Sequence, residues 1–308
     1  MKAEKSLVAF ARLLKNLAVL RRYRSRREIA DTFKVRVPAW RDWLRKRAHR
    51  EWPGGYVLQT DRLYFYVPEQ LDLMGAYKLL KPFKPEPCIR RFCRPGDTVV
   101  DVGANIGEWT LQMADAVGPS GRVIAIEPIP RLVEAVRKSA LANNMRQVEV
   151  VAAALSEIEG KAEFSVERGN TGGSRLGPHP GGAEAFDRIT VRVMTLDALI
   201  AGVGVDRVDF IKVDVEGFEL EVLLGARGTL ARHRPAMYLE LGAEEAAKRP
   251  RLAALLRDEL DYRLLGVVLP GGICDADWDD YLGLRGAFEA GGIRNVLLAS
   301  ASRETAAR

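Results

Sequence analysis

The segment from Asp97 to Thr110, DTVVDVGANIGEWT, constrains the fold more than any other part of the sequence. It predicts an apolar strand, a tight turn that contains Gly103 and Gly107, and the first turn of a helix. Glycine at these two positions lets a ligand approach the backbone N–H groups closely. The acidic Asp101 before the first glycine disfavours a pyrophosphate and favours the amino group of an amino-acid-like cofactor. The Gly-x-x-x-Gly spacing also departs from the dinucleotide fingerprint.

After Gly96 the sequence alternates between short β-branched runs and helical patterns. This alternation predicts parallel βαβ units and an α/β fold, with a doubly wound sheet covered on both faces. The last two strands flank a loop rich in Gly and Asp, so we expect the final strand to run antiparallel. The predicted strands are 98–102, 122–127, 148–153, 208–213, 236–241, 262–268 and 295–299, and the predicted helices are 107–117, 130–143, 218–232 and 250–259.

An extra segment, 156–195, interrupts this alternation between the third and fourth strands. It contains two runs of alternating residues, 161–166 and 189–193, which flank a Gly-rich stretch at 169–182. We therefore predict an inserted β-hairpin that carries a long loop.

The N-terminal part of the chain differs from the rest in charge. Residues 1–52 contain sixteen Lys/Arg and five Asp/Glu, a net charge of +11, whereas the remainder carries −5. Apolar residues at helical spacing predict a basic helix at 4–21 and a second one at 38–48. Aromatic and β-branched residues predict strands within 55–67.

Three parts follow from this organisation. Residues 1–80 form a basic extension, 81–96 form a linker with four prolines, and 97–301 form the main domain. We expect residues 1–50 to contact an anionic membrane surface or to mediate self-association. The cytoplasm is the expected location, because the chain shows no membrane-spanning run, no signal-peptide pattern, and three cysteines without disulfide or zinc-ligand spacing.

Charged side chains follow predicted strands where a nucleoside can bind. Glu127 ends the second strand, and a carboxylate there can accept hydrogen bonds from both hydroxyls of a ribose. Lys212, Asp214 and Glu216 end the fourth strand, where a period of two places all three on one face. Ligands bind at the carboxyl ends of parallel strands, and unpaired charges are costly to bury. We therefore expect these residues to lie in the functional site, paired with one another or with the ligand.

These motifs occur in a specific order along the chain. The turn sequence DVGANIG is followed by EPIP, AALSE, TLDAL, DFIKVDVEGFELEVLLGA and PAMYLEL. Over residues 96–242 this order resembles the FkbM-type S-adenosylmethionine-dependent methyltransferases. The resemblance implies a class I methyltransferase fold, Rossmann-like, and O-methylation of a hydroxyl on a sugar, a glycan or another natural product.

The resemblance also implies roles for individual residues. S-adenosylmethionine would be the cofactor and S-adenosylhomocysteine the product, with Glu127 at the ribose and Ala153 near the adenine. Asp214 or Glu216 would be the general base beside the methyl group and the acceptor, and Lys212 would orient it. The residues expected to bind the cofactor are Asp101, Gly103, Ala104, Asn105, Gly107, Thr110, Glu127, Pro128 and Ala153. Asp214 and Glu216 could ligate a divalent ion, but no further spaced carboxylate or histidine completes a ligand set with them, so no metal ligand is assigned and metal dependence stays open.

Two other functions compete with this interpretation. A nucleic-acid methyltransferase is disfavoured because the main domain has no basic excess. The fourth strand is also followed by Asp214-Val-Glu-Gly rather than by the Asn/Asp-Pro-Pro-aromatic motif of amino-group methylases. A binding module without catalysis would use the basic N-terminal helices at an anionic membrane. We expect a small-molecule or glycan acceptor and no nucleic acid.

Overall fold

The computed structural model describes residues 56–59, 62–68, 87–167, 171–178, 186–241, 247–269, 272–289 and 294–300. The predicted basic helices at 4–21 and 38–48 lie outside the described residues, so the expectations for residues 1–50 stay predictions.

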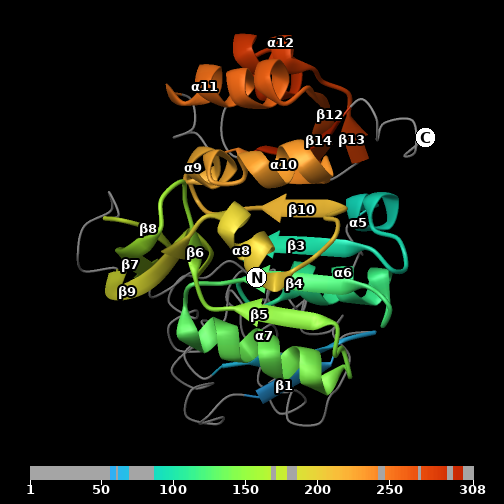
Figure 1. Ribbon diagram of the computed structural model, residues 1–308, viewed down its shortest axis with the longest axis vertical. Coiled ribbons are helices and arrows are strands. Elements are labelled where there is room, and N and C mark those ends of the chain that lie inside the picture. The colour runs from blue at the N-terminus through green and yellow to red at the C-terminus, as the bar shows by residue number, and fades with distance from the viewer. Residues whose placement is uncertain are drawn as a thin grey trace, which may run out of the picture.

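An eight-stranded sheet forms the centre of the structure (Figure 1). Its strands in chain order are β3 (Thr98–Val102), β4 (Arg122–Ile126), β5 (Val148–Val151), β10 (Phe210–Val213), β11 (Ala236–Leu241), β12 (Tyr262–Leu269), β13 (Gly272–Cys274) and β14 (Arg294–Ser300). Their order in the sheet is β13-β12-β14-β11-β10-β3-β4-β5. The five strands from β5 to β11 pair in parallel, whereas β14 pairs antiparallel with β11 and β12. The predicted sheet, mostly parallel with an antiparallel last strand, is confirmed.

Helices cover both faces of this sheet because its central strands are apolar at nearly every position and so expose apolar side chains on both faces. Their bounds are α5 (Pro87–Phe92), α6 (Glu108–Val117), α7 (Pro130–Ala142), α8 (Leu196–Val203), α9 (Glu219–Leu224), α10 (Arg227–His233), α11 (Arg249–Ala253), the π-helical turn η4 (Ala254–Glu259) and α12 (Trp278–Gly283). Val100 and Ile211 face the cluster that includes α8 to α11, whereas Val99 and Phe210 face α5 and α6. None of the described helices is both long enough and apolar enough to cross a membrane.

A second, four-stranded sheet contains the predicted insertion. Its strands are β6 (Ala154–Leu155), β7 (Gly160–Glu167), β8 (Arg175–Leu176) and β9 (Phe186–Met194), in the order β6-β9-β7-β8. The antiparallel pair of β7 and β9 confirms the predicted hairpin. Figure 1 shows this sheet beside the end of the central sheet toward which the arrowheads of β3, β5 and β10 point. The insertion therefore lies at the carboxyl ends of the parallel strands.

A short hairpin before the main domain packs on its outer surface. It consists of β1 (Tyr56–Gln59) and β2 (Tyr64–Val67), which pair antiparallel and confirm the strands expected within 55–67. The Tyr66 amide donates to Ser139 Oγ of α7 at 2.8 Å, and the Asn143 side chain donates to the Tyr64 carbonyl at 2.7 Å. Phe65 is fully buried. This part of the N-terminal extension is thus attached to the main domain.

The structure differs from the predicted linker at 81–96. Residues 87–92 form α5, and its Cys88 and Ile89 are buried against the central sheet. Prolines alone suggested an irregular linker, but proline is well tolerated in the first turn of a helix, and Pro87 begins this one.

Several predicted elements have different boundaries or interruptions in the structure. The third strand ends at Val151 rather than 153, because Ala154 and Leu155 pair with β9 instead. The predicted helix 218–232 is divided into α9 and α10 near Gly225, where a Cβ would lie 2.1 Å from the Ser156 carbonyl oxygen. The predicted helix 250–259 is α11 continued by the π-helical turn η4.

Candidate active site

The turn between β3 and α6 has the backbone conformation that its glycines predict. Gly103 and Gly107 have φ values of 78° and 86°, and Asn105 between them also lies in the left-handed region at 50°. The Gly103 and Ala104 amides both donate to the Ile126 carbonyl at 3.0 Å, which ties the turn to the end of β4. A Cβ on Gly103 would lie 2.0 Å from the Asp214 carbonyl oxygen, so only glycine fits between β3 and β10.

Buried polar side chains stabilise this turn through hydrogen bonds and an ion pair. Asp101 and Thr110 are fully buried, and the Thr110 hydroxyl donates to Asp101 Oδ2 at 2.6 Å. The buried Lys212 donates from Nζ to the Gly103 carbonyl at 2.8 Å and lies 3.5 Å from Asp101 Oδ1. These contacts give Asp101 and Thr110 a role inside the protein. Their expected contact with the cofactor stays a prediction.

Glu127 lies beside the turn, at the end of β4. Its Oε2 accepts a hydrogen bond from the Asn105 amide at 2.8 Å, and its Oε1 accepts one from the Ile129 amide at 2.9 Å. Burial raises the pKa of Glu127 to about 7, although the two backbone hydrogen bonds and the charge of Lys212 oppose the shift. The backbone thus fixes the orientation of the carboxyl group, and each oxygen keeps a second lone pair for a ligand hydroxyl.

The raised pKa of Glu127 predicts a pH-dependent loss of stability. The unfolded state releases its proton near pH 4.5 and the folded state near pH 7, so the free energy of unfolding falls as the pH rises through this window. Between about pH 5 and pH 8 the loss is about 2–3 kcal/mol relative to Glu127→Gln, which cannot ionise. Urea denaturation of both proteins across this range measures it.

Glu134→Gln is the matched control for this measurement. Glu134 lies on α7, and its side chain is 53% exposed and 3.4 Å from Lys138. This variant makes the same chemical change at a position in contact with water, and so measures the effect of the substitution itself. Equal slopes for the wild type and Glu127→Gln would show that burial of Glu127 does not control its ionisation.

Three carboxyl groups meet at the ends of β10 and β11. Asp214, Glu216 and Glu240 each offer one oxygen, and these oxygens all lie within 4.8 Å of one another. Burial, followed by the charge of Asp214 and a hydrogen bond with it, raises the pKa of Glu240 to about 9. Glu240 therefore holds a proton at neutral pH.

Lys212 connects this carboxyl cluster to the turn after β3. Its Nζ lies 3.3 Å from Asp214 Oδ2, and it also donates to the carbonyl of Gly103. Burial by itself lowers the pKa of Lys212, but Asp214 and Asp101 outweigh it and raise the pKa above the usual value. Lys212 is therefore a buried cation paired with Asp214, and its expected role in orienting the general base stays a prediction. The Asp214 side chain is 34% exposed and can meet a ligand.

The loop after Asp214 is held by a fourth acidic residue. Glu216 has a left-handed φ of 54° and is followed by Gly217 at 90°. The buried Glu219 accepts hydrogen bonds from the Val215 and Gly217 amides, both at 3.0 Å. This loop therefore presents Glu216 beside Asp214 in a fixed conformation.

The structure brings the sequence-predicted residues together at one edge of the sheet. Parallel pairing places Val102 beside Val213 and beside Ile126, so the segments after β3, β4 and β10 are adjacent. Pro128 is half-buried, whereas Ala104 and Ala153 are buried. Binding of the cofactor by these residues stays a prediction.

Sequence reasoning missed several residues at this edge. Glu240 completes a set of three carboxyl groups with Asp214 and Glu216, so the expectation that no third ligand is available was wrong. Glu240 could have been found from its position near the end of the fifth strand, since that strand lies next to β10. Sequence reasoning also missed the contacts of Phe218 with Arg175 and Lys248. These contacts depend on where the insertion and the start of α11 lie in the fold, and the sequence does not predict that.

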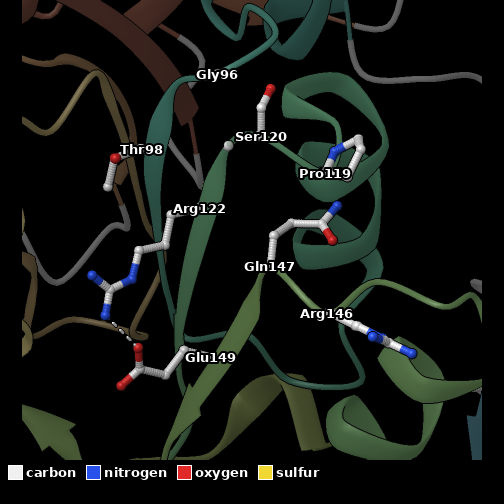
Figure 2. Close-up of a pocket in the computed structure, with 9 residues that line it drawn as sticks. Gly96, Thr98, Pro119, Ser120, Arg122, Arg146, Gln147 and Glu149 are labelled. Carbon is white, nitrogen blue, oxygen red and sulfur yellow. Dashed lines mark hydrogen bonds and ion pairs between the residues drawn. The ribbon is translucent and has the colours of Figure 1, made fainter.

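A cavity of about 470 Å³ lies at the opposite edge of the sheet (Figure 2). Its lining includes Thr98 and Arg122, which begin β3 and β4. Arg122 is paired with Glu149 at 2.7 Å, as the dashed line in Figure 2 shows. This cavity contains none of the predicted site residues, and it lies at the amino ends of the strands. We therefore assign the active site to the carboxyl edge.

The strand order, the glycine turn and the acidic carboxyl edge together define a class I methyltransferase fold. The profile of the methyltransferase FkbM domain matches residues 101–264, more than half of the chain, and the chain belongs to this family.

The chain is also similar to individual proteins. The methyltransferase sdnD of Sordaria araneosa is 27% identical over 234 residues, which cover 66% of this chain and 87% of that protein. The AMB antimetabolite synthetase AmbE of Pseudomonas aeruginosa is 30% identical over 42% of this chain, which spans only 8% of that protein. The solved structure of methyltransferase FkbM from Methylobacillus flagellatus is 18% identical, with a TM-score of 0.41, and covers 73% of this chain and 53% of that one.

Proposed function

We propose that this protein transfers a methyl group from S-adenosylmethionine to a hydroxyl group of a sugar, a glycan or another natural product. The observation that carries the proposal is the carboxyl edge of the sheet, where the turn after β3 and Glu127 lie next to Asp214, Glu216 and Glu240. An acidic edge of this kind complements a cofactor that carries both an ammonium group and a sulfonium group.

The residues at this edge fit S-adenosylmethionine better than a dinucleotide. A pyrophosphate would face the carboxyl groups of Glu127, Asp214 and Glu216, whereas a cationic cofactor is attracted by them. Asp101 Oδ1 is buried, accepts no hydrogen bond from the described residues and lies 3.5 Å from Lys212 Nζ, so it keeps acceptor capacity for a further ammonium group. The carboxyl group of Glu127 is oriented by two backbone amides, as recognition of a ribose requires.

The proposed mechanism assigns one task to each part of the site. When bound, S-adenosylmethionine supplies a methyl group attached to a sulfonium sulfur, which is open to in-line displacement. An alcohol is a weak nucleophile, so a base at its proton accelerates the reaction. Asp214 accepts this proton on its carboxylate, which lies 3.3 Å from Lys212 Nζ. Glu127 and the turn after β3 bind the nucleoside and the amino-acid portion, and positioning supplies much of the rate.

Isothermal titration of the full chain tests the cofactor assignment. We expect S-adenosylmethionine and S-adenosylhomocysteine to bind and NAD not to bind. Glu127→Ala should weaken both affinities by about 1–3 kcal/mol, because it removes a charged hydrogen-bond acceptor from the ribose. Glu149→Ala, which removes a carboxylate at the opposite edge, is the control and should leave both affinities unchanged. Tighter binding of NAD than of S-adenosylmethionine would contradict the proposal.

We further propose that the acceptor is a small molecule or a glycan and that the enzyme works in the cytoplasm. The negative charge of the chain after residue 52 supports an acceptor other than nucleic acid. Cys88, Cys93 and Cys274 are not in disulfide bonds in the described part of the chain, which supports a reducing compartment. We also propose that residues 1–50 serve membrane contact or self-association.

A further inference from the structure

The insertion places one buried hydroxyl group against the turn after β3. Thr171 begins the 3₁₀ turn η1 (Thr171–Gly173) and is only 8% exposed. Its hydroxyl donates a hydrogen bond to Asn105 Oδ1 at 3.3 Å. Asn105 lies between Gly103 and Gly107, in the segment that is expected to hold the methionine portion of the cofactor. The insertion is therefore connected to the turn at the expected cofactor site.

Hydrogen bonds within the insertion hold Thr171 in this position. The Ser174 amide donates to the Thr171 carbonyl at 3.3 Å, and the Ser174 hydroxyl accepts a hydrogen bond from the Glu167 amide at 3.0 Å. Further along, the Gly177 amide donates to the Glu163 carbonyl at 2.8 Å. Since Glu163 and Glu167 belong to β7, the segment that contains Thr171 is attached to this strand at two points.

Two contacts fix Asn105. Its backbone amide donates to Glu127 Oε2 at 2.8 Å, and its side-chain oxygen accepts the hydrogen bond from Thr171. An asparagine side chain has an acceptor oxygen on one side and a donor NH2 group on the other, so a donor at Oδ1 determines which way the amide faces. No described residue accepts a hydrogen bond from Asn105 Nδ2. This group therefore keeps its two N–H donors for a ligand.

The carboxylate of the methionine portion has few other donors at this edge of the sheet. The edge is rich in carboxyl groups, and the buried Lys212 is already paired with Asp101 and Asp214. Four backbone amides of the turn also donate within the protein, namely those of Gly103, Ala104, Asn105 and Gly107. A neutral side-chain amide can bind a carboxylate here without adding a positive charge beside the ammonium group of the cofactor.

We propose that Thr171 is a positioning residue for cofactor binding. Its hydroxyl orients the side chain of Asn105, so that Nδ2 donates to the carboxylate of the methionine portion. Without this hydroxyl the amide is free to turn and to present its oxygen to the carboxylate, which repels it. This inference rests on the proposed function, and it adds the insertion to the cofactor site.

Calorimetry with the full chain tests this role with two ligands. S-adenosylhomocysteine carries the carboxylate, whereas its decarboxylated form keeps the adenosine and the amino group but lacks the carboxylate. Valine is similar in size to threonine but has no hydroxyl. We expect Thr171→Val to weaken binding of S-adenosylhomocysteine roughly 3–10-fold, as loss of one hydrogen bond predicts, and binding of the decarboxylated form less than about twofold. Thr171→Ser retains the hydroxyl and should bind both ligands nearly as the wild type does.

Asn105→Gly tests whether Thr171 acts through Asn105. Glycine suits the left-handed φ of 50° at this position and removes the side-chain amide. This variant should also weaken S-adenosylhomocysteine more than the decarboxylated form. Adding Thr171→Val to it should cause no further loss of affinity, because the group that Thr171 orients is then absent. A further loss as large as in the wild-type background would contradict the proposed role.

Thr190→Val is the matched control, since it makes the same chemical change at an exposed position on β9 of the same insertion. It should leave both affinities unchanged. Unchanged affinity of Thr171→Val for S-adenosylhomocysteine would overturn the inference, and so would an equal loss for both ligands in Thr171→Val or in Asn105→Gly. The wild type is titrated first, and failure of S-adenosylhomocysteine to bind to it would instead identify the proposed function as wrong.

Discussion

Gly103→Ala is expected to destabilise the folded chain by about 2–6 kcal/mol and to abolish binding of S-adenosylmethionine. Two costs add at this position. The φ of 78° lies in the left-handed region, which is strained for any residue with a side chain. The new Cβ would also lie 2.0 Å from the carbonyl oxygen of Asp214. Because this neighbour is backbone rather than a flexible side chain, β3 and β10 must separate to relieve the contact.

Gly204→Ala separates the two costs. Gly204 ends α8 with a φ of 62°, and a Cβ added there would have no neighbouring atom within 4 Å. This variant should lose only about 1–2 kcal/mol, the cost of the left-handed conformation. Urea denaturation of both variants measures the difference, and titration with S-adenosylmethionine reports on the turn. If both variants lost the same free energy of unfolding, the close approach of β3 and β10 would not contribute to the destabilisation.

The glycine turn shows what the sequence alone can predict. Gly103 and Gly107 lie within a local pattern of strand, turn and helix, and the backbone geometry follows from that pattern without any distant contact. The same holds for the parallel strands, whose apolar runs predict them within a few residues. Glu127 was also found locally, because it ends its strand at the edge where ligands bind.

The residues that sequence analysis missed depend on distant contacts. Glu240 joins Asp214 only because β11 pairs with β10, and Thr171 reaches Asn105 only because the insertion folds back over the turn. The break between α9 and α10 has the same origin, since the Ser156 carbonyl approaches Gly225 from the start of the insertion. A helical pattern over 218–232 contains no information about that neighbour, so a continuous helix was the reasonable local prediction.

Asp214→Asn is expected to lower turnover by about 10²–10⁴-fold, with little change in affinity for S-adenosylhomocysteine. Asparagine is similar in size to aspartate, but its amide cannot take up the proton that leaves the hydroxyl group of the acceptor. Asp214 lies 3.3 Å from the buried Nζ of Lys212 and is partly exposed, so it can meet the acceptor. Glu240 instead carries a proton at neutral pH, since burial and Asp214 raise its pKa to about 9.

Glu240→Gln is therefore the informative companion variant. A glutamine resembles the protonated glutamate and can still donate a hydrogen bond to Asp214, so turnover near pH 7 should fall by less than about tenfold. The turnover of both variants is measured as formation of S-adenosylhomocysteine, with an acceptor that the wild type methylates. The affinity of each variant for S-adenosylhomocysteine shows whether the turn after β3 is intact. If Asp214→Asn and Glu240→Gln lost turnover equally, the base would be shared by the pair. If Asp214→Asn kept near-normal turnover, positioning alone would account for methyl transfer at this site.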